Sequence, residues 1–337
     1  YEAAYQLPSS SSEPAVAAAR GEPAEEEDWV TIDGFSTPAV DVTDRRFMAD
    51  PAFPPDKLGL WSAIPVEHDG WVRAHNAVRH ELSQFKSALS QSAAGALEGW
   101  QVTAIKAYVQ GHLVHVHEHH SNEDDVFNPA LRKRVVYPEK LEADHVQLVE
   151  LMDAVEKATA ELKVGSSVAA LLELWTRYEA LMLPHLHEEE VVGLPLARAY
   201  FAPKEIGKIV ESFMKNGDLT SMGGFVHAMG SKKAVLEFMA ENGIPSFVWH
   251  LPSVGWKALR ARYRAKMQSH VDSLIAGKVV SSVHKPKGGG KAATMALPDE
   301  NATAQSLSPA KRVNVEVLGS VGGAGLAAMV RSPLRAK

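Results

Sequence analysis

Apolar residues recur at steps of three and four along the middle of the chain, roughly between residues 66 and 277. This spacing is the period of an amphipathic α-helix. It predicts four long helices, which span about 66–89, 97–124, a stretch from 139 to beyond 155, and 166–200. Proline is expected to end the second helix before Pro129 and to bend or break the fourth at Pro184. Because the links are short, the four helices are expected to form an antiparallel bundle.

Shorter helices are predicted after the bundle. Pro203 suits a first helical turn and Gly217 a helix end, and two further helices are expected over 231–243 and 256–275. Strand signals are weak, since no hairpin dipeptide stands between two alternating runs. The predicted fold class is all-α, an antiparallel four-helix bundle with a C-terminal helical extension and disordered tails. The predicted parts are a disordered acidic segment at 1–28, an irregular lead-in at 29–65, the bundle at 66–200, the extension at 201–280 and a flexible basic tail at 281–337.

The composition combines fifteen histidines with no cysteine. The lack of cysteine excludes disulfides, cysteine-ligated zinc modules, iron–sulfur clusters and thiol nucleophiles. Any metal site must therefore use nitrogen and oxygen ligands. The net charge of −6 argues against a nucleic-acid partner. No run of apolar residues is long enough for a transmembrane span.

The two ends of the chain carry opposite charge. Residues 1–28 hold seven acidic residues and one basic residue, whereas 281–337 hold eight basic and three acidic residues. Two solvated tails are the simpler interpretation, and the alternative is that the charged tails bind a protein partner or a membrane surface. The sequence starts at Tyr1 rather than Met, so an upstream segment that could carry a targeting signal is expected to have been removed. The compartment stays open between the cytoplasm and an organelle.

Histidines gather where the four long helices are predicted, because eleven of the fifteen lie between residues 68 and 187. Histidine and glutamate are spaced four residues apart on both the second and the fourth helix, which places each pair on one helix face. The first and third helices each add one histidine. The candidate metal ligands are His75, His119, Glu123, His145, His185 and Glu189.

Paired carboxylates and imidazoles suit a site with two metal ions. Two nearby divalent ions repel each other, and a carboxylate that gives one oxygen to each ion lowers this cost. Neutral imidazoles fill the remaining positions without adding charge. This ligand set suits iron, and it also permits zinc, manganese or copper. A coordination position left open would bind a small gas or an oxidant.

Four segments resemble the hemerythrin-like (HHE cation-binding) family, in the same order along the chain. They are His75-Asn-Ala-Val-Arg-His-Glu-Leu82, His119 with Glu123 through Leu131, Glu142-Ala-Asp-His145, and His185 through Leu196. The resemblance covers about 66–200. It implies a four-helix bundle with two iron ions, joined by an oxo or hydroxo bridge. The implied terminal ligands are His75, His119, His145 and His185. The implied bridging carboxylates are Glu123 and Glu189.

One position departs from the family pattern. Oxygen-carrying members have a second histidine one turn after the third-helix histidine, and this chain has Val149 there. His120 or Glu142 is the candidate to fill the gap. The departure argues against simple reversible oxygen carriage, and it favours a protein that senses oxygen, nitric oxide or iron.

Three functions are consistent with the sequence. The preferred one is a di-iron protein that binds or senses oxygen, nitric oxide or iron. A di-iron oxidase or iron-repair enzyme ranks lower, because no general acid or base stands out beyond the ligands. The third is a scaffold with a degenerate site. His112 and His115 form a stripe with His119 that could extend a polar channel, although surface or packing roles are favoured for them.

Overall fold

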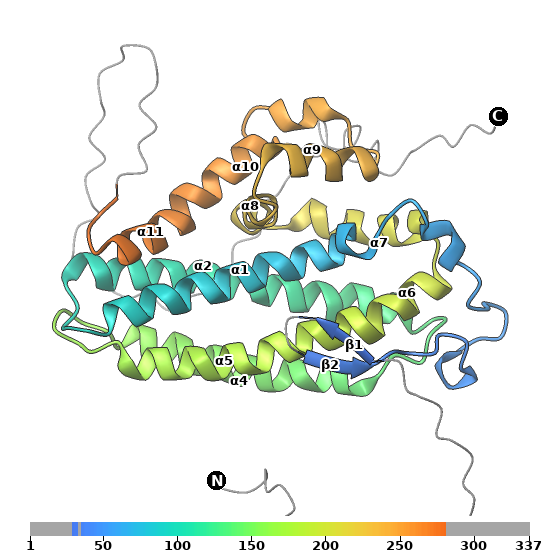
Figure 1. Cartoon of the computed structure of the whole chain (residues 1–337), viewed down its shortest axis with the longest axis horizontal. Coiled ribbons are helices and arrows are strands. Elements are labelled where there is room, and N and C mark those ends of the chain that lie inside the picture. Colours follow the sequence, from blue (N-terminus) through green and yellow to red (C-terminus); the bar gives the residue numbers. More distant parts are fainter. Residues whose placement is uncertain (1–28, 33–34, 281–337) are drawn as a thin grey trace, which may run out of the picture.

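The computed structural model describes residues 29–32 and 35–280, and it is mostly helical (Figure 1). This confirms the prediction of a predominantly helical chain. The four long helices are α1 (Gly70–Ser92), α2 (Gly99–Asn122), α4 (Glu139–Ala160) and α5 (Ala169–Glu188). The two flanking segments that were predicted to be disordered tails, 1–28 and 281–337, lie outside the described residues.

The long helices lie side by side and enclose an apolar core (Figure 1). α4 packs against both α2 and α5, and α1 packs against α5. Phe85 of α1 lies at the centre of the core, where its ring stacks on Tyr108 at 4.5 Å and meets the edge of Trp175 at 4.7 Å, measured between ring centroids. Burying each such side chain stabilises the fold by roughly 1.5–3 kcal/mol.

The starts of the helices follow local capping and differ slightly from the prediction. α1 begins after Asp69, because the Asp69 carboxylate accepts a hydrogen bond from the backbone N–H of Trp71. A 3₁₀ turn, η3 (Val66–His68), precedes it. α4 begins after Pro138, as predicted. Pro184 does not break α5, which continues through this residue, and the alternative of a bend stays a prediction.

Two of the long helices are extended by a π-helical turn and a short α-helix. α2 is followed by η4 (Glu123–Phe127) and α3 (Asn128–Leu131), and α5 is followed by η5 (Glu189–Gly193) and α6 (Leu194–Tyr200). α2 itself ends at Asn122, before Pro129 as predicted, but the helical path does not stop there. The helical path continues because the wider π turn accommodates the missing N–H of proline.

The C-terminal part forms further helices on the side of α1 and α2 that faces away from α4 and α5 (Figure 1). They are α7 (Pro203–Asn216), α8 (Leu219–Ala228), α9 (Lys232–Glu241), η6 (Ser246–His250), α10 (Trp256–Tyr263), η7 (Arg264–Gln268) and α11 (Ser269–Ala276). The predicted helices in this region are confirmed. α8 crosses α10 closely at Gly223, where a Cβ atom would lie 2.3 Å from the carbonyl oxygen of Leu259. The division into a bundle at 66–200 and an extension at 201–280 stays a prediction.

The lead-in at 29–65 contains more regular structure than expected. β1 (Trp29–Ile32) pairs antiparallel with β2 (Phe35–Pro38), and the 3₁₀ turns η1 (Arg45–Phe47) and η2 (Leu58–Trp61) follow. The sequence between the strands is Asp33-Gly34, a dipeptide that favours a two-residue hairpin and that was the overlooked signal. Among the described residues, no helix combines the length and apolar character needed to cross a membrane.

Candidate metal centre

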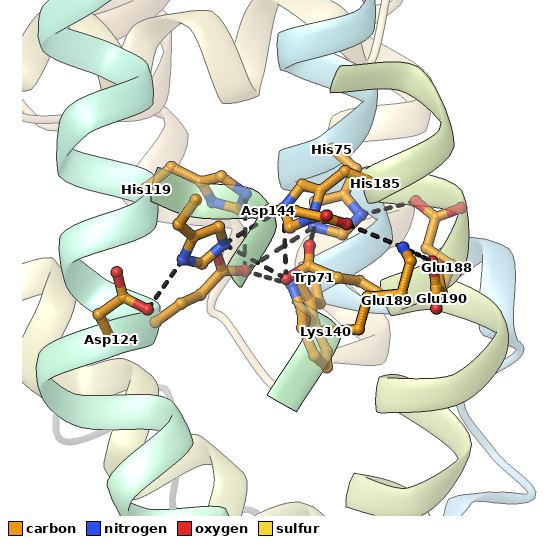
Figure 2. A network of polar contacts seen from close by, with 12 residues as sticks. Trp71, His75, His119, Asp124, Lys140, Asp144, His185, Glu188, Glu189 and Glu190 are labelled. Atoms are coloured by element: carbon orange, nitrogen blue, oxygen red, sulfur yellow. Dashed lines mark hydrogen bonds and ion pairs between the residues drawn. The ribbon is translucent and has the colours of Figure 1, made fainter. Parts of the chain in front are cut away.

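Two groups of side chains bring their possible ligand atoms together within 4.8 Å in each group. One group is His75, His119, Glu123 and Glu189, and the other is His120, His145 and His185. Figure 2 shows labelled members of both groups converging from different helices. The six residues that the sequence singled out as ligands all fall in these groups. His120, named in advance as a candidate to fill the gap, completes the second group.

The two carboxylates occupy equivalent positions in the chain. Glu123 is the first residue of η4 and Glu189 is the first residue of η5. Pro129 and Pro195 each follow six residues later. In each turn a backbone N–H bonds five residues back to the carbonyl of the glutamate, which is the π-helical pattern. π turns of this kind are frequent at functional sites. Here each π turn begins at a glutamate that lies one helical turn after a histidine.

The first group is arranged around His75. Its Nε2 lies 3.2 Å from Oε2 of Glu189 and 3.9 Å from Oε1 of Glu123. Nε2 of His119 lies 3.5 Å from the same Oε1 of Glu123. These imidazole nitrogens and carboxylate oxygens therefore point into one small volume.

The second group consists of three imidazoles. The rings of His120 and His145 stack with 4.3 Å between centroids, and Nε2 of His145 lies 3.2 Å from Nε2 of His185. Oε2 of Glu123 is 3.8 Å from Nε2 of His145, and Oε1 of Glu189 is 3.6 Å from Nε2 of His185. Each carboxylate therefore turns one oxygen towards each group.

Many of these polar atoms are buried and have no hydrogen-bond partner. The unpartnered atoms include Nε2 of His75 and of His119, both ring nitrogens of His120, and Oε2 of Glu123 and of Glu189. Buried polar groups are normally hydrogen-bonded, and leaving one unsatisfied costs about 1–3 kcal/mol. A convergent set of nitrogen and oxygen lone pairs is what metal cations bind, so the residues present fit a metal centre.

The outer nitrogen of His75 is held by an acidic side chain. Nδ1 of His75 lies 2.8 Å from Oε1 of Glu190, and Arg79 donates to both oxygens of that carboxylate at 2.6 and 3.1 Å. Such a contact fixes the ring orientation and makes the inner nitrogen a better ligand. No role was predicted for Glu190 from the sequence, where it stands in a run of acidic residues.

Acidic side chains also lie near the outer nitrogens of His145 and His185. Nδ1 of His145 lies 2.8 Å from Oδ1 of Asp124. Nδ1 of His185 lies 3.7 Å from Oδ2 of Asp144, which is too long for a hydrogen bond, and Lys140 donates to that oxygen at 3.0 Å. Asp124 and Asp144 each adjoin a predicted ligand in the sequence. Their position next to a predicted ligand was the signal in the sequence for a role at the centre, and no such role was predicted.

Trp71 of α1 also contacts the centre. Its indole N–H donates to Oε1 of Glu123 at 2.7 Å, and its ring meets the edge of Phe127 at 4.7 Å. The indole therefore fixes one oxygen of a carboxylate that faces both groups. Spacing in the sequence held no signal for this contact, since 52 residues separate the two partners.

Burial and mutual charge shape the ionisation of the centre. Burial, helped by nearby imidazoles, holds the pKa of His119 and of His120 well below the usual value, so both rings are neutral. Burial and the charge of Glu189 raise the pKa of Glu123. Burial opposes protonation of His75, but the surrounding carboxylates outweigh it and raise the pKa of that ring. Neutral imidazoles are the form that binds metal.

Two positions from the sequence analysis lie apart from the centre. Glu142, the other candidate to fill the gap, forms an ion pair with Arg132 and belongs to neither group. Val149 is 37% exposed, so a histidine there would start from the solvent side of α4. His120 of α2 is the side chain that stands beside His145 instead.

His112 and His115 form a separate buried cluster with Glu81. Nδ1 of His112 lies 2.7 Å and Nδ1 of His115 lies 3.1 Å from the Glu81 carboxylate, and Nε2 of His112 contacts the hydroxyl of Tyr178 at 3.1 Å. Burial raises the pKa of Glu81, but the two imidazoles outweigh it and lower that pKa to about 2. Neither histidine lies on the surface, so the stripe predicted from the sequence lies within the core.

The two ligand groups lie in the helical part of the chain and could each hold a metal ion. Residues 67–197 match the family described as the hemerythrin HHE cation binding domain. The resemblance drawn from the sequence is confirmed over this segment. No curated protein and no solved structure matches the chain.

Proposed function

We propose that α1, α2, α4 and α5 form an antiparallel four-helix bundle that binds two iron ions, and that the centre binds or senses oxygen, nitric oxide or iron. The observation that carries the proposal is the orientation of Glu123 and Glu189. The two oxygens of each carboxylate face different ligand groups. A carboxylate placed in this way can bridge two cations.

The ligands divide unequally between the two positions. His75 and His119 would bind one iron, and His120, His145 and His185 the other, with Glu123 and Glu189 shared between them. Bound iron would supply redox chemistry and an open coordination position for a diatomic molecule. The chain's own residues exclude bulk water, because six of these seven side chains are buried.

A scaffold with a degenerate site fits these observations less well. Two buried carboxylates beside each other raise the energy of the metal-free fold, and so do the unpartnered imidazole nitrogens. Glu190 and Asp124 also hold the outer nitrogens of His75 and His145. These features are costly unless a cation is bound, which supports a working metal centre.

Metal analysis with absorption spectroscopy tests the proposal. The full chain, purified from iron-replete cells, is expected to carry close to two irons and to show a spectrum that changes on reduction and on adding nitric oxide. Glu123→Ala and Glu189→Ala should lose iron, whereas Glu156→Ala, at an exposed position of α4, should keep it. A chelator should lower the melting temperature, since a ligand at a thousand times its Kd stabilises by about 4 kcal/mol. Wild-type protein that holds no iron, or that melts equally with and without chelator, would contradict the proposal.

A further inference from the structure

The helical segment formed by α10 and η7 is basic, although the whole chain has a net charge of −6. Residues 242–271 contain no aspartate or glutamate, and they include five basic side chains, which are Lys257, Arg260, Arg262, Arg264 and Lys266. Within the described residues, none of the five forms an ion pair with a carboxylate. α10 packs on α8, and α8 packs in turn on α1 (Figure 1). This part of the surface therefore carries a local excess of positive charge.

Two histidines from the neighbouring helices adjoin this basic segment. The ring of His227 on α8 lies 5.4 Å from the ring of His80 on α1 and 5.0 Å from the ring of Tyr263 on α10, measured between centroids. Nε2 of His80 and Nδ1 of His227 are buried and have no hydrogen-bond partner. A buried polar atom without a partner is unfavourable, so the meeting point of the three helices lacks a polar group.

Arg260 and Arg264 stand beside the two histidines. They are four residues apart on a continuous helical path, which places them on one face. The guanidinium of Arg260 donates to the backbone carbonyl of Gly230, just beyond the end of the helix that carries His227. The carbonyls at that helix end offset part of one positive charge. We call His80, His227, Arg260 and Arg264 the basic junction.

The groups of the basic junction repel one another. Burial, and then the positive charges of His80, Arg260 and Arg264, lower the pKa of His227 to about 4. Burial and the charge of Arg264 also lower the pKa of Arg260. A fold that gathers like charges in a partly buried place is less stable for it, unless a negative charge is supplied.

The carboxylates of the adjoining elements have partners of their own. Glu81 borders α8, where a Cβ atom on Gly224 would lie 3.1 Å from its Oε1, and it contacts His112 and His115 at 2.7 and 3.1 Å. Asp272 accepts a hydrogen bond from Gln268 at 2.9 Å. Neither carboxylate forms an ion pair with Arg260 or Arg264, so the missing negative charge would have to come from another molecule.

We propose that the basic junction binds a phosphate-bearing anion. The fork of N–H donors on a guanidinium matches phosphate oxygens, and a doubly charged phosphate offsets the two guanidinium charges together. The net charge of −6 disfavours a long polyanion such as a nucleic acid, which would meet repulsion beyond the junction. Arg260, Arg264 and His227 lie outside residues 67–197, which match the family, and the proposal does not depend on bound iron.

Calorimetric titration of the full chain with pyrophosphate tests the proposal. Ionic strength is held constant, and a chelator keeps pyrophosphate from acting through bound iron. One pyrophosphate should bind per chain with a Kd below about 1 mM. Iron content is measured on separate samples, so failure of this proposal is distinguishable from failure of the metal centre.

Charge-removing variants locate the anion. Arg260→Gln and Arg264→Gln should each raise the Kd at least about tenfold, because a charge-assisted hydrogen bond is lost. Arg262→Gln is the matched control, because Arg262 is exposed and, two residues from Arg260, points to the other side of the helix. It should raise the Kd no more than about twofold. Circular dichroism shows whether each variant folds, and the exposed Arg264 decides if Arg260→Gln does not. An equal loss of affinity in Arg262→Gln and Arg264→Gln would show general charge attraction and overturn the proposal.

Vesicle sedimentation distinguishes a lipid headgroup from a soluble phosphate. The probes are phosphatidylcholine vesicles with and without phosphatidic acid. Binding that requires phosphatidic acid and is lost in Arg264→Gln, with weak binding of pyrophosphate, assigns the junction to a lipid headgroup. Binding of pyrophosphate without binding to either vesicle assigns it to a soluble phosphorylated compound. Binding of neither probe would overturn the proposal.

Discussion

His120 offers a prediction with opposite signs in the metal-free and metal-loaded protein. Its ring is 4% exposed, and both nitrogens are buried without a hydrogen-bond partner. Burial and the neighbouring His145 hold its pKa well below the usual value, so the ring is neutral at pH 7. The change we consider is His120→Leu, which replaces the ring with an apolar side chain of similar size.

The magnitude follows from the contacts. Each unsatisfied nitrogen costs about 1–3 kcal/mol, and the substitution removes two of them. The variant also loses the stacking on His145, which is worth about 0.5–1.5 kcal/mol. The two nitrogens together cost about 2–6 kcal/mol, so after the lost stacking we expect His120→Leu in chelator to be more stable than wild type by about 0.5–5 kcal/mol. In iron we expect the reverse, because one of three nitrogen ligands is missing and the iron content should fall from two to about one per chain.

Urea unfolding and calorimetry in chelator and in iron measure both signs, with iron analysis on the same samples. His117→Leu is the matched control, because His117 lies on the same helix and is exposed. That control should leave iron content and stability nearly unchanged in both conditions. The reasoning is refuted if His120→Leu is less stable than wild type in chelator, or if it retains two irons per chain.

Two further predictions concern the groups around the centre and within the core. Glu190→Ala should weaken iron binding about 10- to 100-fold in a chelator competition assay, because His75 and Arg79 lose their carboxylate partner, while Glu156→Ala should not. The folded-state pKa of Glu81 is lowered from 4.5 to about 2, so its ionised carboxylate contributes stability above pH 4.5 that is lost as the pH falls to about 2. Urea unfolding should show wild type exceeding Glu81→Gln by up to about 3 kcal/mol at pH 6 and by little at pH 2, and a pH-independent difference would contradict the assigned contact.

Local rules predicted most of the helices but misjudged their continuity. The starts at Pro138, Pro203 and Ser231 follow from capping and the fixed geometry of proline, which act within a few residues. α2 ends before Pro129 as expected, but the helical path continues past this proline through η4 and α3. A rule that treats proline as a helix breaker does not include this option.

The sequence by itself determined the residue types and the helix faces that can form a metal centre. Spacing of four residues fixes histidine and glutamate on one face, because the helix period is a local property of the backbone. Only the tertiary structure decided that His120 rather than Glu142 stands beside His145. It also decided that Asp124 and Glu190 orient two of the imidazoles, and that Trp71 contacts Glu123. Those choices depend on how helices far apart in the sequence rotate and pack against one another. The cavity of about 360 Å³ that Trp71, His119 and Glu123 help to line also depends on this packing, because its walls come from helices separated by more than a hundred residues.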